Sequence, residues 1–329
     1  MPKKHVLTIL KSSLAIGILY WLVNSGKVDF SKVNILFTNW VILTTFIFSR
    51  LAGTTLLSAY RWKVLLNALA IRLKFFDSVN LQLVGSFFNV AMPGSVGGDL
   101  IKAYYVGKEQ PKHGYSKSLI SIFMDRLIGL STLMAIWFIF VMLNFGSFFE
   151  ISAFKPVLLI SLFVFGAMVL SILGIVFFSK KKFVFKLIRK LRKSKLSSIG
   201  KLIQALTKYR KKPNAISLSI VISALSHSII MLYFWVLCSA GELSNISLMN
   251  FIAVYPIGML LTALPLSPGG LGVGHIAFEK LFLIFGSYGG ANAFNVFIFT
   301  NLMVNLLGFI PYILRKKSLN TKAPQVTNA

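Results

Sequence analysis

Residues 91–100 read AMPGSVGGDL, and residues 266–275 read LSPGGLGVGH. In each stretch an apolar segment runs into Pro-Gly, further glycines follow, and the next segment opens with a polar residue. This order predicts a helix, a tight turn and a second helix. Short helices interrupted by Gly and Pro at corresponding places in two halves of a chain are typical of the midplane site of a membrane transporter.

The composition of the whole chain agrees with a membrane location. Of 329 residues, 56% are hydrophobic and only 13% are charged, and the mean hydropathy is +0.77. A soluble domain carries about 25% charged residues, so this chain lacks the charge needed to cover a water-facing surface. A single cysteine, Cys238, excludes a disulfide scaffold. We therefore expect a polytopic membrane protein and exclude a soluble enzyme and a disordered chain.

Apolar segments of about 20 residues can cross the bilayer as helices. The candidate spans are 6–23, 40–60, 118–143, 155–178, 215–238 and 292–314. Two further apolar stretches, 78–92 and 250–265, are interrupted by the glycine-rich turns. The predicted fold class is an all-α integral membrane protein, with about six transmembrane helices and two re-entrant hairpins at about 78–117 and 250–286. These elements form one domain, 1–317, followed by a polar tail, 318–329, that we expect to be disordered.

The net charge of +27 indicates the orientation of the spans. Segment 179–213 has 14 Lys and Arg residues and no acidic residue, and basic loops lie on the cytoplasmic side. Both termini are then cytoplasmic, in a bacterial-type inner membrane, and the two hairpins enter from opposite faces. The pattern of 179–213 is that of amphipathic helices on anionic lipid headgroups, so the basic excess favours a lipid surface over nucleic acid.

The glycine-rich turns have a chemistry of their own. Glycine adopts positive φ and lets a ligand approach the backbone closely, and the helix that follows presents free N–H groups to an anion. The alternative is that Pro-Gly merely bends the helices. The candidate binding residues in the turns are Pro93, Gly94, Gly97, Gly98, Pro268, Gly269, Gly270, Gly272 and Gly274.

Charged residues inside apolar spans are functional candidates because they are costly to insert. Arg50 lies at the middle of span 40–60, where it either binds phosphate through its planar guanidinium or pairs with Asp125. Asp125 and Arg126 are adjacent in span 118–143. Because they are about 100° apart around the helix, we expect one to face a cavity and the other a neighbouring helix or the interface.

Four further polar residues follow the two turns. Asp99 either caps the second helix of its hairpin or faces a cavity, and Lys102 either reaches toward a phosphate or extends to the membrane surface. His275 is a phosphate ligand or proton carrier, or else a neutral helix cap. Glu279 lies one turn further on, where it can pair with His275.

Known catalytic and cofactor motifs are absent from the sequence. It has no CxxC or HExxH metal motif, no Walker A sequence and no G-x-S-x-G nucleophile motif, so we predict neither a metal nor a cofactor. Transport of an anionic lipid or lipid-linked headgroup between leaflets fits the cationic residues best. The alternatives are a membrane-embedded transferase, which would need Asp99 or Asp125 as a general base, and an accessory membrane subunit.

The motifs also carry a family resemblance. Pro93–Asp99 with Lys102, the pair Asp125-Arg126, and Pro265–Val273 together resemble the membrane region of lysylphosphatidylglycerol synthases. The resemblance covers roughly residues 5–315. It implies a flippase-like fold with two re-entrant hairpins around a lipid headgroup site, without the soluble aminoacyl-transferase domain. Two departures concern headgroup specificity, because the family commonly has Glu where His275 stands and often has Arg in place of Lys102.

Overall fold

The structure is a computed structural model that describes residues 30–91, 96–110, 114–177, 189, 208–239, 243–264 and 270–314. Its main helices are α4 (Trp40–Phe48), η1 (Ser49–Leu57), α5 (Ser58–Ala68), α6 (Phe75–Ala91), α7 (Val96–Glu109), α8 (Gly114–Leu143), α10 (Lys155–Phe177), α13 (Pro213–Ser239), α14 (Leu248–Thr262), α15 (Val273–Leu283) and α16 (Gly290–Leu307). Short helices are α2 (Phe30–Val33), α3 (Ile35–Thr38) and α9 (Phe145–Phe149). The predicted first span, 6–23, most of segment 179–213 and the tail 318–329 lie outside the described residues.

Four of the described helices are long and apolar enough to cross a membrane. They run over Trp40–Ala68, Tyr115–Leu143, Pro213–Ser239 and Gly290–Leu314, and they match four of the predicted spans. A shorter apolar helix, Lys155–Ser171, stands where span 155–178 is predicted. The all-α membrane fold is thus confirmed, while the total of six spans stays a prediction.

The first of these long helices has an unusual centre. Between α4 and α5, the nine residues of η1 form a π-helix. The wider turns alter the ladder of main-chain hydrogen bonds, and the carbonyl of Gly53 accepts a hydrogen bond from the Ser226 hydroxyl of α13 at 2.8 Å. π-Helical turns are rare and frequently occur at functional sites. Here the segment contains Arg50.

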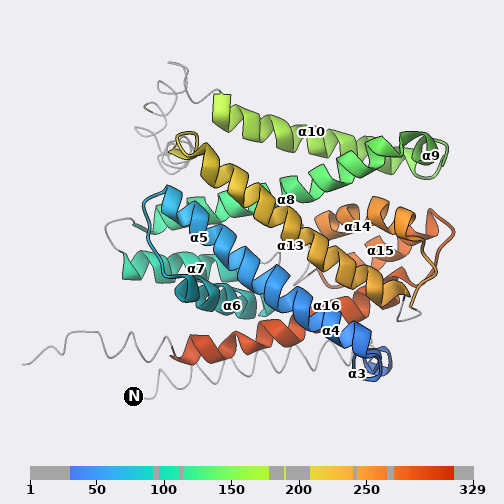
Figure 1. The fold of residues 1–329 in the computed structure, drawn as a ribbon, viewed down its shortest axis with the longest axis horizontal. Helices are drawn as coiled ribbons and strands as arrows, with labels where there is room; N and C mark the ends of the chain where they lie inside the picture. The colour runs from blue at the N-terminus through green and yellow to red at the C-terminus, as the bar shows by residue number, and fades with distance from the viewer. Residues whose placement is uncertain are drawn as a thin grey trace, which may run out of the picture.

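The helices on either side of the two glycine-rich stretches pair as expected for hairpins. Helices α6 and α7 pack against each other, as do α14 and α15. Figure 1 shows the α6–α7 pair and the α14–α15 pair on opposite sides of the view, with α13 and the α4–α5 helix crossing between them. How the hairpins sit relative to a bilayer stays a prediction.

The described core divides into two apolar clusters. One surrounds the second hairpin and is rich in stacked rings, including Phe234 against Phe297 at a centroid distance of 4.6 Å. The other lies by the first hairpin and centres on Trp62. There the buried hydroxyl of Tyr209 donates to the Leu65 carbonyl at 3.1 Å. Burial raises the pKa of Tyr209 above its usual range, which keeps the phenol a neutral donor.

Candidate functional site

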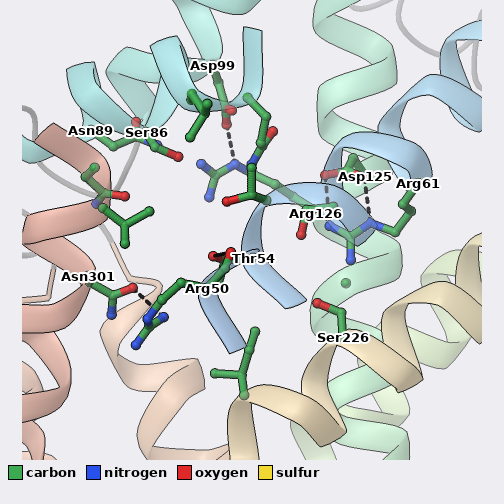
Figure 2. A pocket seen from close by; sticks show the side chains of 18 of the residues that line it. Arg50, Thr54, Arg61, Ser86, Asn89, Asp99, Asp125, Arg126, Ser226 and Asn301 are labelled. Atoms are coloured by element: carbon green, nitrogen blue, oxygen red, sulfur yellow. Dashed lines mark hydrogen bonds and ion pairs between the residues drawn. The ribbon is translucent and has the colours of Figure 1, made fainter. Parts of the chain in front are cut away.

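A cavity of about 320 Å³ opens among the long helices next to the first hairpin. Its described lining comes from the α4–α5 helix, α6, α7, α8, α13 and α16. Figure 2 shows charged and polar side chains converging on it from these elements. Ligand pockets for small molecules are about 300–1,000 Å³, so this space suits a headgroup rather than a whole lipid.

Arg50 reaches the cavity from the π-helical segment. Its guanidinium donates to Asn301 Oδ1 at 2.7 Å and to Thr300 Oγ1 at 3.2 Å, both on α16. It also lies 4.6 Å from the centre of the Phe297 ring. Arg50 is only 2% exposed, and its Nε has no hydrogen-bond partner within the described residues. A buried guanidinium with neutral partners needs an anion to compensate its charge.

Of the two alternatives for Arg50, the pair with Asp125 is wrong, because Arg61 binds this carboxylate. Arg61 donates from Nε to Asp125 Oδ1 at 2.7 Å and from Nη2 to Oδ2 at 2.9 Å, a bidentate pair. A third bond runs from Nη1 to the hydroxyl of Ser223 at 2.7 Å. The predicted span 40–60 ended eight residues too early and so did not include Arg61. The helix instead continues to Ala68 and buries Arg61.

A second ionic group connects the first hairpin to α8. Asp99 forms an ion pair with Lys102 at 3.1 Å and accepts a hydrogen bond from the guanidinium of Arg126. The Lys102 side chain is 7% exposed; it also donates to Gln82 and lies over the Trp62 ring. Lys102 therefore does not extend to the membrane surface, and Asp99 takes the cavity position.

The expectation that only one of Asp125 and Arg126 faces the cavity is also wrong. Both residues line it. The reason is that α5 and α7 both contact α8. Arg61 on α5 therefore pairs with Asp125, and Asp99 on α7 pairs with Arg126 (Figure 2). The side chain of Arg126 is 38% exposed, the most accessible of these ionic groups.

The glycines of the first hairpin serve helix packing. A Cβ atom at Gly98 would overlap the backbone carbonyl of Gly85, so α6 and α7 approach with main chain against main chain. The Gly98 N–H is not free for a ligand, because Asn89 Oδ1 accepts it at 2.7 Å. Gly97 is buried at the start of α7. Of the predicted turn residues, Pro93 and Gly94 lie outside the described residues.

The second hairpin does not contribute a described residue to the lining of this cavity. Gly270 and Gly272 both have φ of +79°, as predicted for a tight turn, and a Cβ at Gly274 would overlap the Phe294 ring. Pro268 and Gly269 lie outside the described residues.

The polar residues of α15 take part in capping. His275 Nδ1 accepts the Gly272 N–H at 3.3 Å, and its Nε2 lies 3.2 Å from Asn295 Oδ1, a pattern that fits a neutral imidazole. Glu279 accepts the N–H of Ala291 at 2.9 Å, at the start of α16. This geometry favours the cap over the phosphate ligand for His275.

Several lining residues escaped the sequence analysis. Arg61 could have been found from the need of a buried Asp125 for a cation. The other residues are neutral, and the signal that could have found them is polar residues recurring at helical spacing within an apolar segment. They are Gln82, Ser86 and Asn89 on α6, and Asn301 and Asn305 on α16. His227 also lines the cavity, with its Nε2 3.0 Å from the Gly129 carbonyl.

Long apolar helices, two helical hairpins and a cationic cavity among them define a multi-pass membrane protein. The model of the lysylphosphatidylglycerol synthase TM region matches residues 8–308. The chain belongs to this family, as the sequence motifs indicated. No curated protein and no solved structure matched the chain. The described residues contain no group of three or more His, Cys, Asp or Glu side chains that could hold a metal ion.

Proposed function

We propose that this protein is a flippase-like transporter that moves an anionic phospholipid or a lipid-linked anionic headgroup between the leaflets. The observation that carries the proposal is Arg50. It is a buried cation at the middle of a membrane-crossing helix, it faces a headgroup-sized cavity, and no carboxylate pairs with it within the described residues. A phosphate entering the cavity would supply the missing anion, and guanidinium binds phosphate in a planar, bidentate manner.

The charge of the cavity as a whole supports the same substrate class. Its described lining contains four cations, from Arg50, Arg61, Lys102 and Arg126, and two carboxylates, from Asp99 and Asp125. The formal excess is two positive charges. Such an excess inside a low-dielectric cleft attracts anions.

The paired carboxylates argue against the transferase alternative. A general base must be able to accept a proton from the substrate. Asp99 and Asp125 each contact cations through both oxygens, so neither carboxylate has an oxygen that is free of a cation for this role.

We further propose that the protein lies in the cell membrane with both termini in the cytoplasm, where its basic segments contact anionic headgroups. In a Cys238→Ser background, Ser116→Cys at the start of α8 is expected to react with an impermeant thiol reagent only after permeabilisation, whereas Ser147→Cys in α9 is expected to react in intact cells. Both positions are exposed. Labelling of Ser116→Cys in intact cells would contradict the orientation.

Transport is tested with the full chain in proteoliposomes that contain a fluorescent phosphatidylglycerol. Loss of the outer-leaflet signal to a membrane-impermeant quencher measures movement between leaflets, and mass spectrometry of the lipids detects any modification. We expect faster movement than in protein-free vesicles and an unchanged lipid composition. A modified lipid would support the transferase alternative. If the lipid is neither moved nor modified, the accessory-subunit alternative remains.

A further inference from the structure

The acceptor oxygens of several cavity side chains are already engaged by cations or by a backbone N–H, and this limits the headgroups that the cavity accepts. The carboxylate oxygens illustrate the point. Asp125 gives both oxygens to Arg61, and Asp99 gives one to Lys102 and one to Arg126. Each of the four oxygens therefore already contacts a cation, three through hydrogen bonds and Asp99 Oδ1 through an ion pair, and an ammonium group entering the cavity would find no carboxylate that is not already paired.

The side-chain amides of the cavity have a fixed orientation. Asn301 Oδ1 accepts from Arg50, Gln82 Oε1 accepts from Lys102, and Asn89 Oδ1 accepts from the N–H of Gly98. Because guanidinium, ammonium and backbone N–H are donors only, the oxygen of each amide must be the bonded atom. The three NH₂ groups form no hydrogen bond within the described residues and remain as donors.

The described lining of the cavity also lacks Phe, Tyr and Trp rings, which commonly bind cationic headgroups where no carboxylate is free. Quaternary ammonium groups are commonly held by the faces of several aromatic rings. The described lining contains no Phe, Tyr or Trp side chain; its apolar members are Leu83, Leu130, Ile230 and Val304.

We propose that the cavity takes a headgroup made of a phosphate and further acceptor oxygens, such as hydroxyls or carbonyls, and that it excludes headgroups that carry an ammonium. This inference rests on the proposed function and specifies its substrate class. The phosphate meets Arg50 and the excess positive charge, and the other oxygens meet the NH₂ groups of Asn301, Gln82 and Asn89. An ammonium is repelled by the same charge and leaves these donors unsatisfied.

Binding to the purified full chain in detergent tests the inference apart from transport. The probes are short-chain phosphatidylglycerol, phosphatidic acid, phosphatidylethanolamine and phosphatidylcholine, each titrated while thermal stability is followed. We expect phosphatidylglycerol and phosphatidic acid to bind at least about tenfold more tightly than the two ammonium lipids, because the excess positive charge of the cavity repels an ammonium. Binding of either ammonium lipid within about threefold of phosphatidylglycerol would overturn the inference, as would the failure of every probe to bind.

A soluble phosphate ester could present the same chemistry as a lipid, and one further titration separates them. If glycerol 3-phosphate competes with phosphatidylglycerol, the cavity recognises the free headgroup; if it does not, recognition requires the acyl chains. Both results are compatible with the proposed headgroup chemistry only if the two ammonium lipids bind weakly.

Two variants each replace a side-chain amide of the cavity by a carboxylate. Asn301→Asp replaces an NH₂ donor by an acceptor beside Arg50, and Gln82→Glu does the same beside Lys102. Each is expected to lower the preference for phosphatidylglycerol over phosphatidylethanolamine by about tenfold. Asn214→Asp, the same change at an exposed position of α13, is the matched control and is expected to leave the ratio unchanged. An unchanged ratio in both cavity variants would contradict the inference. Selective binding without lipid movement in vesicles would instead contradict the proposed function alone.

Discussion

The two hairpins have the same order of elements and opposite surroundings. The first, α6–α7, brings Asp99 and Lys102 to a cationic cavity. The second, α14–α15, is packed among rings such as Phe251, Phe278 and Phe294, and its polar side chains take part in capping. The difference teaches that a glycine-rich hairpin in a membrane domain does not by itself predict where a polar cavity lies. The polar residues on the helices that face the first hairpin make that cavity.

The two sides also differ in what stabilises them. Near the first hairpin, ion pairs join helices that are distant in sequence, as Arg61 and Asp125 join α5 to α8. Near the second hairpin, the stacked rings of Phe234 and Phe297 join α13 to α16, and a hydrogen bond from the Trp137 indole to the Ala253 carbonyl at 3.0 Å joins α8 to α14. Substitutions on the two sides should therefore destabilise the protein in different ways.

The largest effect is expected from breaking the Arg61–Asp125 pair. Asp125→Asn leaves the buried Arg61 without its carboxylate, which should reduce the free energy of unfolding by about 3–5 kcal/mol. Thermal unfolding of the purified protein measures the loss. The double variant Arg61→Met with Asp125→Leu should recover most of the stability, since an apolar pair of similar volume can replace a buried ion pair. If Asp125→Asn alone unfolds like the unaltered protein, the ion pair does not stabilise this side.

Arg50 tests whether the cavity side carries the function. Arg50→Met should slow lipid movement by roughly 10–100-fold, because a charged hydrogen bond to the substrate is worth about 1.5–3 kcal/mol. Its thermal stability should stay close to that of the unaltered protein, since no carboxylate loses a partner within the described residues. Arg50→Lys keeps the charge but not the planar fork, and an intermediate rate is expected. Normal transport by Arg50→Met would rule out Arg50 as the anion-binding group.

The close approach of α6 and α7 predicts a smaller effect. Gly98→Ala places a methyl group against the carbonyl of Gly85, and such overpacking costs about 1–3 kcal/mol. The matched control is Gly146→Ala in α9, where no atom lies within 4 Å of the new Cβ. A lower unfolding midpoint is expected for Gly98→Ala alone. Equal midpoints would mean that the first hairpin tolerates separation of its helices.

The smallest effect is expected at the second hairpin. Glu279→Gln weakens the cap of α16, and His275→Ala removes the cap of α15, each at about 0.5–2 kcal/mol of stability. Lipid movement per folded molecule should remain unchanged in both, because neither residue lines the described cavity. A specific loss of transport at full stability would assign the second hairpin a direct role and would remove the functional difference between the hairpins.

The sequence alone determined the class of fold and the position of both hairpins. Apolar runs of sufficient length, Pro-Gly turns and the low content of charged residues predict an all-α membrane protein without any knowledge of tertiary contacts. The spans 118–143 and 215–238 agree with α8 and α13 within a few residues. Arg50 stood out because a charge at the middle of an apolar span requires an explanation.

Only the tertiary structure decided which charges meet. The sequence offered only Arg50 as a partner for Asp125, whereas the packing of α5 against α8 pairs Asp125 with Arg61. The hydrogen bond of Arg50 to Asn301 likewise joins two helices that are distant in the chain. Hydrophobic periodicity records which face of a helix avoids water, but it carries no information on which polar side chains converge inside the bundle.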